Sequence, residues 1–287
     1  MKIIFSLIYL LFIDGFMLVS LAVVALAMAT QAVVYQELTF QPLYLLLFTG
    51  TLSAYNWHRL VKTKQAENPL NRVRYLRKNR LPLLMLLFSL PVLLLSLFYV
   101  NRIILIILAP LAFVTFLYSL PTRLKLWFFP VRKIPYIKVF LVALAWAAAT
   151  VILPLAGDLL TQDKTTVLLA FTGYFLLVLA VTIPFDIRDM ESDRAFGIKT
   201  LPVVFGIRKS INISIATSLM FFMSALALGI LTGKLFIPVT AMITEIILVP
   251  LLLCIKCSKN PLYHVLVLDG LLLLYGLMIV AGVYFFG

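Results

Sequence analysis

The residues best suited to chemistry lie in one stretch, Phe185 to Asp193, which reads Phe-Asp-Ile-Arg-Asp-Met-Glu-Ser-Asp. Four of the chain's 11 acidic residues lie here: Asp186, Asp189, Glu191 and Asp193. At about 100° per residue in a helix, the three aspartates share one face about 60° wide, and Glu191 points elsewhere. Carboxylates held together repel one another unless water, a metal ion or bases offset their charge. Because carboxylate oxygens suit Mg²⁺, which often bridges to substrate phosphates, the pattern indicates a metal and phosphate site.

The acidic stretch ends a long apolar run, and the whole chain is built of such runs. The 287 residues are 63% hydrophobic and 12% charged, with a mean hydropathy of +1.11, which excludes an ordinary soluble domain. Runs of about 20 apolar residues are long enough to cross a bilayer as helices. We predict an all-α integral membrane protein, a single domain over 1–287 with nine transmembrane helices. The predicted spans are about 4–31, 39–61, 81–100, 102–120, 136–157, 164–186, 210–231, 234–256 and 262–286.

The basic residues predict how the chain lies in the membrane. The net charge of +13 does not indicate a nucleic-acid partner, because the bases lie in short loops between apolar spans. With the N-terminus inside, 21 of the 24 Lys and Arg residues fall on the inner side. The positive-inside rule then predicts a multi-pass protein of the cell membrane with a cytoplasmic N-terminus and the C-terminus outside. The acidic stretch and the end of the second span would both face the cytoplasm.

The residues after the acidic stretch extend the pattern. From Asp186 to Gly206 the chain reads Asp-x-x-Asp-x-x-x-Asp-Arg-x-x-Gly-Ile-Lys-Thr-Leu-Pro-Val-x-x-Gly. This resembles the second aspartate-rich motif of the UbiA superfamily of intramembrane prenyltransferases. The predicted topology, with motifs at the cytoplasmic ends of spans two and six, is also similar. The resemblance implies a UbiA-like bundle with a central cavity open to the cytoplasm.

The resemblance also implies a reaction. In the family, Mg²⁺ held by two aspartate-rich motifs binds the diphosphate of a polyprenyl donor, and a lipophilic acceptor in the membrane attacks the resulting allylic cation. The catalytic residues and metal ligands would be Asp186, Asp189 and Asp193. Lys199 would contact the diphosphate. Lys133 and Lys138, in the basic segment before and at the start of span five, would be further phosphate contacts.

The first motif departs from the family pattern. The family has Asn-x-x-x-Asp-x-x-x-Asp after span two, and here Asn56 is followed by Leu60 and Lys64 at the acidic positions. Bases dominate this side, and Arg59 and Lys64 lie closest to the expected site, so we predict that they bind substrate with Asn56. The lost acids leave open a second interpretation, a non-catalytic isoprenoid- or lipid-binding protein of the same fold.

Three acids lie within predicted spans: Asp14, Glu245 and Asp269. Ionisable groups at membrane depth are costly and often functional. Asp269 is predicted to reach the cavity and contact substrate. Because proton relays use such residues, a small proton-coupled transporter is a third interpretation.

Overall fold

Nine α-helices, and no strand, make up the part of the chain that the structure describes. The computed structural model describes residues 9–64, 80–119, 134–255 and 263–286. The α-helices are α2 (Met17–Tyr35), α3 (Pro42–Lys64), α5 (Arg80–Leu97), α6 (Arg102–Ser119), α7 (Ile137–Ala147), α8 (Lys164–Ala195), α9 (Leu201–Thr232), α10 (Phe236–Cys254) and α11 (Gly270–Phe286). Three π-helical turns adjoin them: η1 (Leu10–Asp14) before α2, η3 (Ala148–Ile152) after α7 and η5 (Tyr263–Asp269) before α11.

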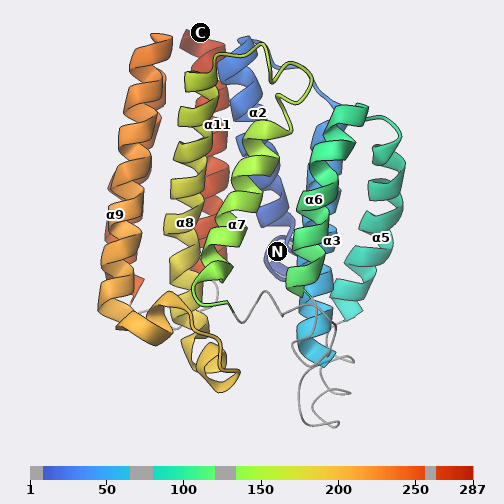
Figure 1. The fold of residues 1–287 in the computed structure, drawn as a ribbon, viewed down its shortest axis with the longest axis vertical. Coiled ribbons are helices and arrows are strands. Elements are labelled where there is room, and N and C mark those ends of the chain that lie inside the picture. Colours follow the sequence, from blue (N-terminus) through green and yellow to red (C-terminus); the bar gives the residue numbers. More distant parts are fainter. Residues whose placement is uncertain (1–8, 65–79, 120–133, 256–262, 287) are drawn as a thin grey trace, which may run out of the picture.

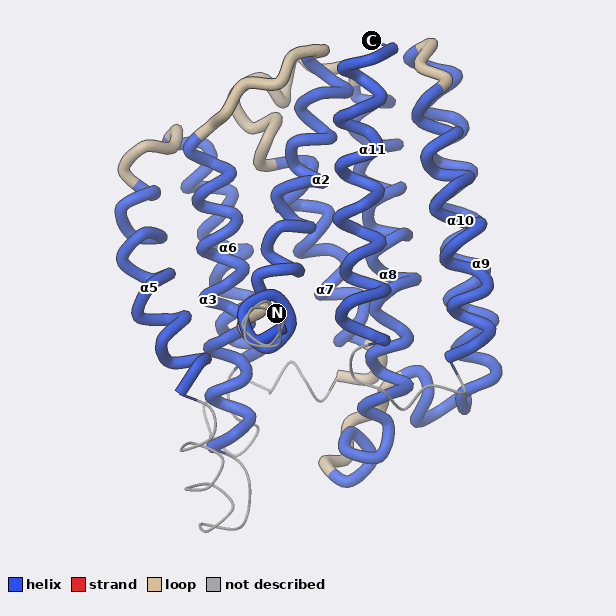
Figure 2. Tube along the Cα trace, turned by 180° about the vertical axis from the view of Figure 1, so that it is seen from behind, coloured by secondary structure: helices blue, strands red, loops and turns tan. Residues whose placement is uncertain are grey.

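The helices lie side by side in one bundle, with successive helices running in opposite directions (Figures 1 and 2). Six described helices are long and apolar enough to cross a membrane: α2, α5, α8, α9, α10 and the helix that includes α11. The mixed-polarity helix α3 and the shorter apolar helices α6 and α7 complete the nine. This confirms the predicted all-helical membrane protein. The ends of α3 and α8 lie at the same end of the bundle, the lower end in Figure 1.

Hydroxyl groups and small residues join the long helices α8 and α9. Ser214 Oγ donates to the carbonyl of Ala180 at 2.6 Å, and Ser224 Oγ donates to the carbonyl of Leu169 at 2.8 Å. Gly173 faces this second contact, and a Cβ there would lie at van der Waals distance, 3.4 Å, from Ser224 Oγ. Helices in lipid associate through such close packing and hydrogen bonds, because lipid provides no hydrophobic drive between them.

Helices α2 and α11 approach one another still more closely. A Cβ on Gly276 of α11 would lie 2.7 Å from the carbonyl carbon of Ala25 in α2. Three further residues of α2 are fully buried: Ala22, Leu26 and Ala29. The absence of a side chain at Gly276 therefore sets the distance between these two backbones.

The acidic stretch is helical along its whole length. Helix α8 continues to Ala195, beyond the predicted end of span six at 186, and α9 begins at Leu201, before the predicted start of span seven at 210. Hydropathy marks only the apolar part of a helix, whereas the helix continues until a residue breaks it. Gly197, at φ 69°, ends the turn after α8, and Gly206, at φ 80° and ψ 167°, interrupts α9. Both conformations favour glycine, so the glycines of the motif shape this turn.

Candidate functional site

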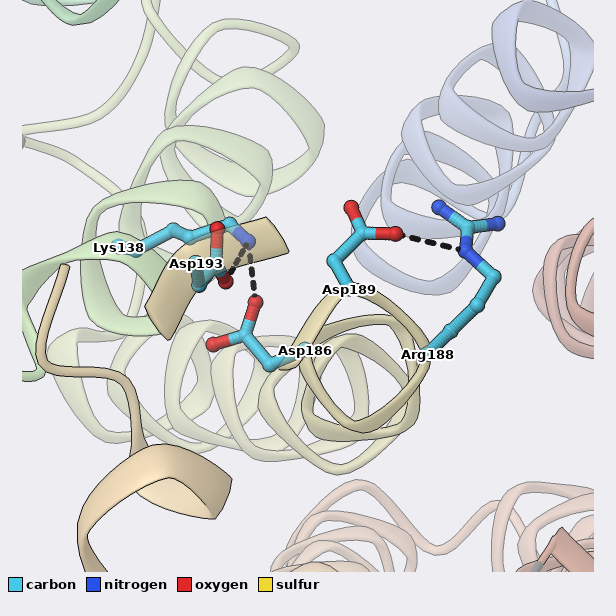
Figure 3. Close-up of polar contacts among 5 residues, drawn as sticks. All are labelled: Lys138, Asp186, Arg188, Asp189 and Asp193. Carbon is cyan, nitrogen blue, oxygen red and sulfur yellow. Dashed lines mark hydrogen bonds and ion pairs between the residues drawn. The ribbon is translucent and has the colours of Figure 1, made fainter. Parts of the chain in front are cut away.

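A buried ion cluster lies where the start of α7 meets the end of α8. Lys138, in the first turn of α7, places its ammonium between Asp186 and Asp193 of α8 (Figure 3). Its Nζ lies 2.6 Å from Asp186 Oδ1 and 3.2 Å from Asp193 Oδ2. The two aspartates are 1% and 4% exposed, and the Lys138 side chain is 16% exposed. Because seven residues make about two helical turns, both carboxylates lie on one face and one ammonium serves both.

Asp189 belongs to the same helix but makes a different ion pair. Arg188 Nε lies 3.0 Å from Asp189 Oδ1, and the guanidinium carbon lies 5.0 Å from the centre of the Phe185 ring. Figure 3 shows the Asp189 carboxylate turned toward Arg188, whereas Asp186 and Asp193 meet Lys138. Helical periodicity places the three carboxylates on one face, but two of them pair with Lys138 and the third pairs with Arg188.

The start of α7 is fixed by the turn that follows the acidic helix. The backbone N–H of Tyr136 donates to the carbonyl of Lys199 at 2.9 Å, and the Tyr136 ring stacks on Phe205 with centroids 5.6 Å apart. The N–H of Ile198 donates to the carbonyl of Asp193 at 2.9 Å, which closes the turn at the end of α8. These contacts place the first turn of α7, and with it Lys138, against the acidic face.

The donor chemistry of the cluster suits a divalent cation. Asp186 Oδ2 is buried and has no hydrogen-bond partner, so a lone pair of a carboxylate is available inside the protein. Three carboxylates against the two bases Lys138 and Arg188 leave one uncompensated negative charge among these five residues. In the arrangement of the described residues, no three His, Cys, Asp or Glu side chains converge as a metal-ligand set, because Lys138 lies between two of the three carboxylates.

Asn56 and Arg59 of α3 donate hydrogen bonds to backbone carbonyls at the break between η1 and α2. Asn56 Nδ2 donates to the carbonyls of Gly15, at 3.1 Å, and Leu52, at 2.8 Å. Arg59 Nη1 donates to the carbonyl of Asp14 at 2.6 Å, and its Nη2 lies 3.6 Å from Asp14 Oδ1. Carbonyls at a break in a membrane helix need donors from neighbouring helices, and these two side chains supply them. Asn56 Oδ1 is buried and has no hydrogen-bond partner.

The other predicted site residues differ in how far the structure places them. The Lys199 side chain is exposed, next to the turn that its carbonyl helps to form. Asp269 is the last residue of η5, which packs against α2 and α8. Lys64 ends α3, but its side chain lies outside the described part, as does the whole of Lys133.

The remaining intramembrane acid, Glu245, is buried in α10, and α10 packs along α9. Asp14, by contrast, pairs with Arg59, which gives that acid a role in joining α3 to the start of α2. Asp14, Glu245 and Asp269 lie in three different helical segments. A proton path that joins them stays a prediction.

Sequence reasoning missed two contributors to the cluster. Arg188 lies inside the acidic motif, and its charge among four acids was a signal that it pairs with one of them. Tyr136 gave no such signal, because its contacts with the turn at Lys199 join residues 63 positions apart. Lys138 was predicted as a phosphate contact, and in the structure it binds Asp186 and Asp193.

The fold and the cluster together define a class: a polytopic helical membrane protein with a buried site of mixed charge at one end of its bundle. The sequence profile of the UbiA prenyltransferase family matches residues 59–261, which is most of the chain. The chain therefore belongs to the UbiA prenyltransferase family. No curated protein sequence matches it significantly.

Solved structures of UbiA homologues share the fold. The apo UbiA homologue of Aeropyrum pernix K1 superposes with a TM-score of 0.66 at 13% identity, covering 92% of this chain and 96% of that one. The UbiA homologue of Archaeoglobus fulgidus bound to GPP and Mg²⁺ has a TM-score of 0.62 at 17% identity, with 95% and 99% covered. A digeranylgeranylglyceryl phosphate synthase structure has a TM-score of 0.58 at 15% identity and covers 99% of both chains. At these identities the likeness establishes the fold.

Proposed function

We propose that this protein is a membrane prenyltransferase, which moves a polyprenyl group from its diphosphate to a lipophilic acceptor. It lies in the cell membrane with its N-terminus in the cytoplasm and its C-terminus outside, as the excess of bases on one side predicts. The observation on which the proposal rests is the cluster of Lys138, Asp186 and Asp193, because it concentrates buried charge at one end of an apolar bundle. A polyprenyl diphosphate has the matching character, with a charged head and an apolar tail.

Asp186, Asp189 and Asp193 are the residues that would hold Mg²⁺. Carboxylate oxygens are the ligands that this ion prefers, and the buried Asp186 Oδ2 has no competing hydrogen-bond partner. The Archaeoglobus fulgidus homologue, whose fold this chain shares, was solved with GPP and Mg²⁺. Bound at these carboxylates, Mg²⁺ would neutralise charge on the oxygens of the leaving diphosphate.

The chain's own residues then have distinct roles. Lys138 orients Asp186 and Asp193 and compensates their charge, because a buried carboxylate without a cation is costly. Lys199, which is exposed beside the cluster, binds diphosphate oxygens. Arg59, Asn56, Lys64 and Lys133 remain candidates for the same role on the basis of sequence. They would bind the diphosphate directly on the side where the family's two metal-binding acids are replaced by Leu60 and Lys64.

The transfer itself breaks one bond and forms another. The bond from the allylic carbon to the diphosphate oxygen breaks, and its electron pair leaves with the diphosphate. The acceptor then forms a new bond to that carbon and releases a proton. The apolar helices that surround the site would keep water from the cation until the acceptor attacks. Asp269, at the start of the last helix, is placed by this proposal on the substrate side of the cavity.

One specific observation favours a second candidate function. Leu60 and Lys64 occupy the acidic positions of the first motif, so both acids of that motif are missing. A protein that binds isoprenoid lipids without transferring them would retain the fold and the ion cluster but would not need both motifs.

Diphosphate release separates the two candidates. The purified protein, in nanodiscs, would be incubated with radiolabelled polyprenyl diphosphates of several lengths, Mg²⁺ and an extract of membrane lipids. The proposal predicts Mg²⁺-dependent release of diphosphate and a labelled lipid product. Lipid binding that needs no Mg²⁺, with no turnover of any donor, would reject the transferase and favour the binding protein.

A variant pair tests the residues. Asp189→Asn with Asp193→Asn should lower the rate by at least about a hundredfold, the scale of losing preorganised charge at a reacting group. Glu191→Gln is the matched control, because it removes an exposed acid from the same helix and should leave the rate within about twofold. Full activity in the double variant would show that the metal assignment is wrong.

A further inference from the structure

A polar pocket lies at the end of the bundle opposite the ion cluster, among elements that end or begin at the upper end in Figure 1. Its volume is about 380 Å³, and it lies between the end of α2 with the loop that follows it, the start of α6 and the segment after η3. Its polar lining residues are Gln31, Tyr35, Glu37, Thr39, Gln41, Asn101 and Asp158. None of these belongs to the acidic motif or to the basic segments, so the proposed transferase activity does not use them.

Gln31 provides the evidence that this pocket is a site. It is 3% exposed, and its Nε2 donates to Thr39 Oγ1 at 2.8 Å, which fixes the amide. Gln31 is among the residues that line the pocket, and its Oε1 is buried without a hydrogen-bond partner. A buried carbonyl oxygen without a donor destabilises the fold, so a ligand that donates a hydrogen bond there would stabilise the protein.

The charges around the pocket select the sign of the ligand. Two carboxylates line it, those of Glu37 and Asp158, and the Tyr35 hydroxyl donates to Asp158 Oδ2 at 3.2 Å, which orients that group. No Lys or Arg is among the described residues that line it. Lys234, which lies near this end of α2, donates instead to the carbonyl of Val33. The pocket therefore favours a cation.

The size and the donor set narrow the cation to one chemical class. The volume is more than ten times the roughly 30 Å³ share of one water, so it exceeds what a bare metal ion fills. Tyr35 is the one aromatic residue among the described lining residues, so there is no aromatic cage for a quaternary ammonium. Carboxylates and an amide carbonyl are instead acceptors for N–H groups. We propose that this pocket binds a primary ammonium group, from either a lipid head group or a soluble amine.

Two binding measurements distinguish those sources. Native mass spectrometry of the detergent-purified protein would compare phosphatidylethanolamine with phosphatidylcholine of the same acyl chains, which differ only in the ammonium. Thermal shift with ethanolamine, against choline, would test the soluble amine. A preference of roughly tenfold for phosphatidylethanolamine assigns a lipid head group. Stabilisation by ethanolamine without a lipid preference assigns a soluble amine. Equal binding of both lipids with no effect of ethanolamine, or stabilisation by Ca²⁺ alone, overturns the proposal.

Variants connect the binding to this pocket. Asp158→Asn removes the charge from an exposed residue with little change of shape, and Gln31→Met removes the unpartnered carbonyl. Each should reduce the preference for the primary ammonium by roughly tenfold. Gln162→Met is the control, because it makes the same change at a partly exposed residue outside the pocket. If Gln31→Met does not fold, Asp158→Asn still decides, and an unchanged preference in Asp158→Asn rejects the site.

Discussion

The ion pair of Lys138 with Asp186 and Asp193 permits a quantitative test of the candidate site. Lys138→Met keeps most of the side chain's apolar volume and removes the ammonium that lies 2.6 and 3.2 Å from the two carboxylates. Removing one partner of a buried ion pair typically costs about 3–5 kcal/mol, because the remaining charge has no compensation. The partial exposure of Lys138 lets some water reach the site, so we expect the lower end, about 3 kcal/mol.

A double-mutant cycle shows whether that loss comes from the carboxylates. Asp186→Asn alone removes one buried charge and leaves Lys138 paired with Asp193. In the combination Lys138→Met with Asp186→Asn, the total loss should be smaller than the sum of the two single losses by at least about 1.5 kcal/mol. The free energy of unfolding, from equilibrium denaturation in mixed detergent micelles, gives all four values.

The control for this cycle is Lys199→Met. Lys199 belongs to the same motif and is exposed, so its loss should change the free energy of unfolding by less than about 0.5 kcal/mol. If Lys138→Met were as mild as this control, or if the losses in the cycle were additive, the ion cluster would not contribute as we infer. The proposed role of Lys138 in orienting the acidic residues and compensating their charge would then fail as well.

Three further predictions concern the helices that support the site. Gly276→Val should destabilise the protein by at least about 2 kcal/mol, because its Cβ would lie 2.7 Å from the Ala25 backbone. Gly270→Ala is the control, because a Cβ there meets open space, and this variant should be neutral or stabilising. Thermal unfolding of both variants measures the difference. Gly197→Ala should cost about 1–2 kcal/mol at φ 69°, measured by the same denaturation, and an unchanged value would show that the turn can relax. Hydrogen bonds from the hydroxyl and the backbone N–H three residues later lower the pKa of Asp163, the N-cap of α8. The stabilisation of α8 by the Asp163 carboxylate should therefore be complete above the ordinary pKa of about 3.8 and be lost as the pH falls through the lowered pKa of the folded state. Hydrogen exchange of the first turn of α8, compared between the wild type and Asp163→Ala, measures this loss.

Much of the fold follows from local features of the sequence. Hydropathy predicted nine spans, and the described part of the chain holds nine α-helices, six of them long and apolar enough to cross a membrane. The prediction works because a helix satisfies its own backbone hydrogen bonds in lipid and its side chains there must be mostly apolar. The motif from Asp186 to Gly206 indicated the family, and the family profile confirms it. The spacing of Asp186 and Asp193 placed them on one helical face, since the helical repeat depends on the backbone alone.

Only the tertiary structure decided which charges meet. Lys138 lies 55 positions from Asp193, and it reaches that carboxylate because Tyr136 binds the turn at Lys199. In the same way Asn56 meets the carbonyl of Gly15, 41 positions away. The pocket around Gln31 depends on three segments that are separate in the chain. Contacts of this kind depend on how helices pack and where their ends stop, and neither hydropathy nor helical periodicity contains that information. The sequence by itself determined the membrane fold, the family and the acidic face of α8. Helix packing decided that Lys138 lies between two carboxylates of that face, those of Asp186 and Asp193.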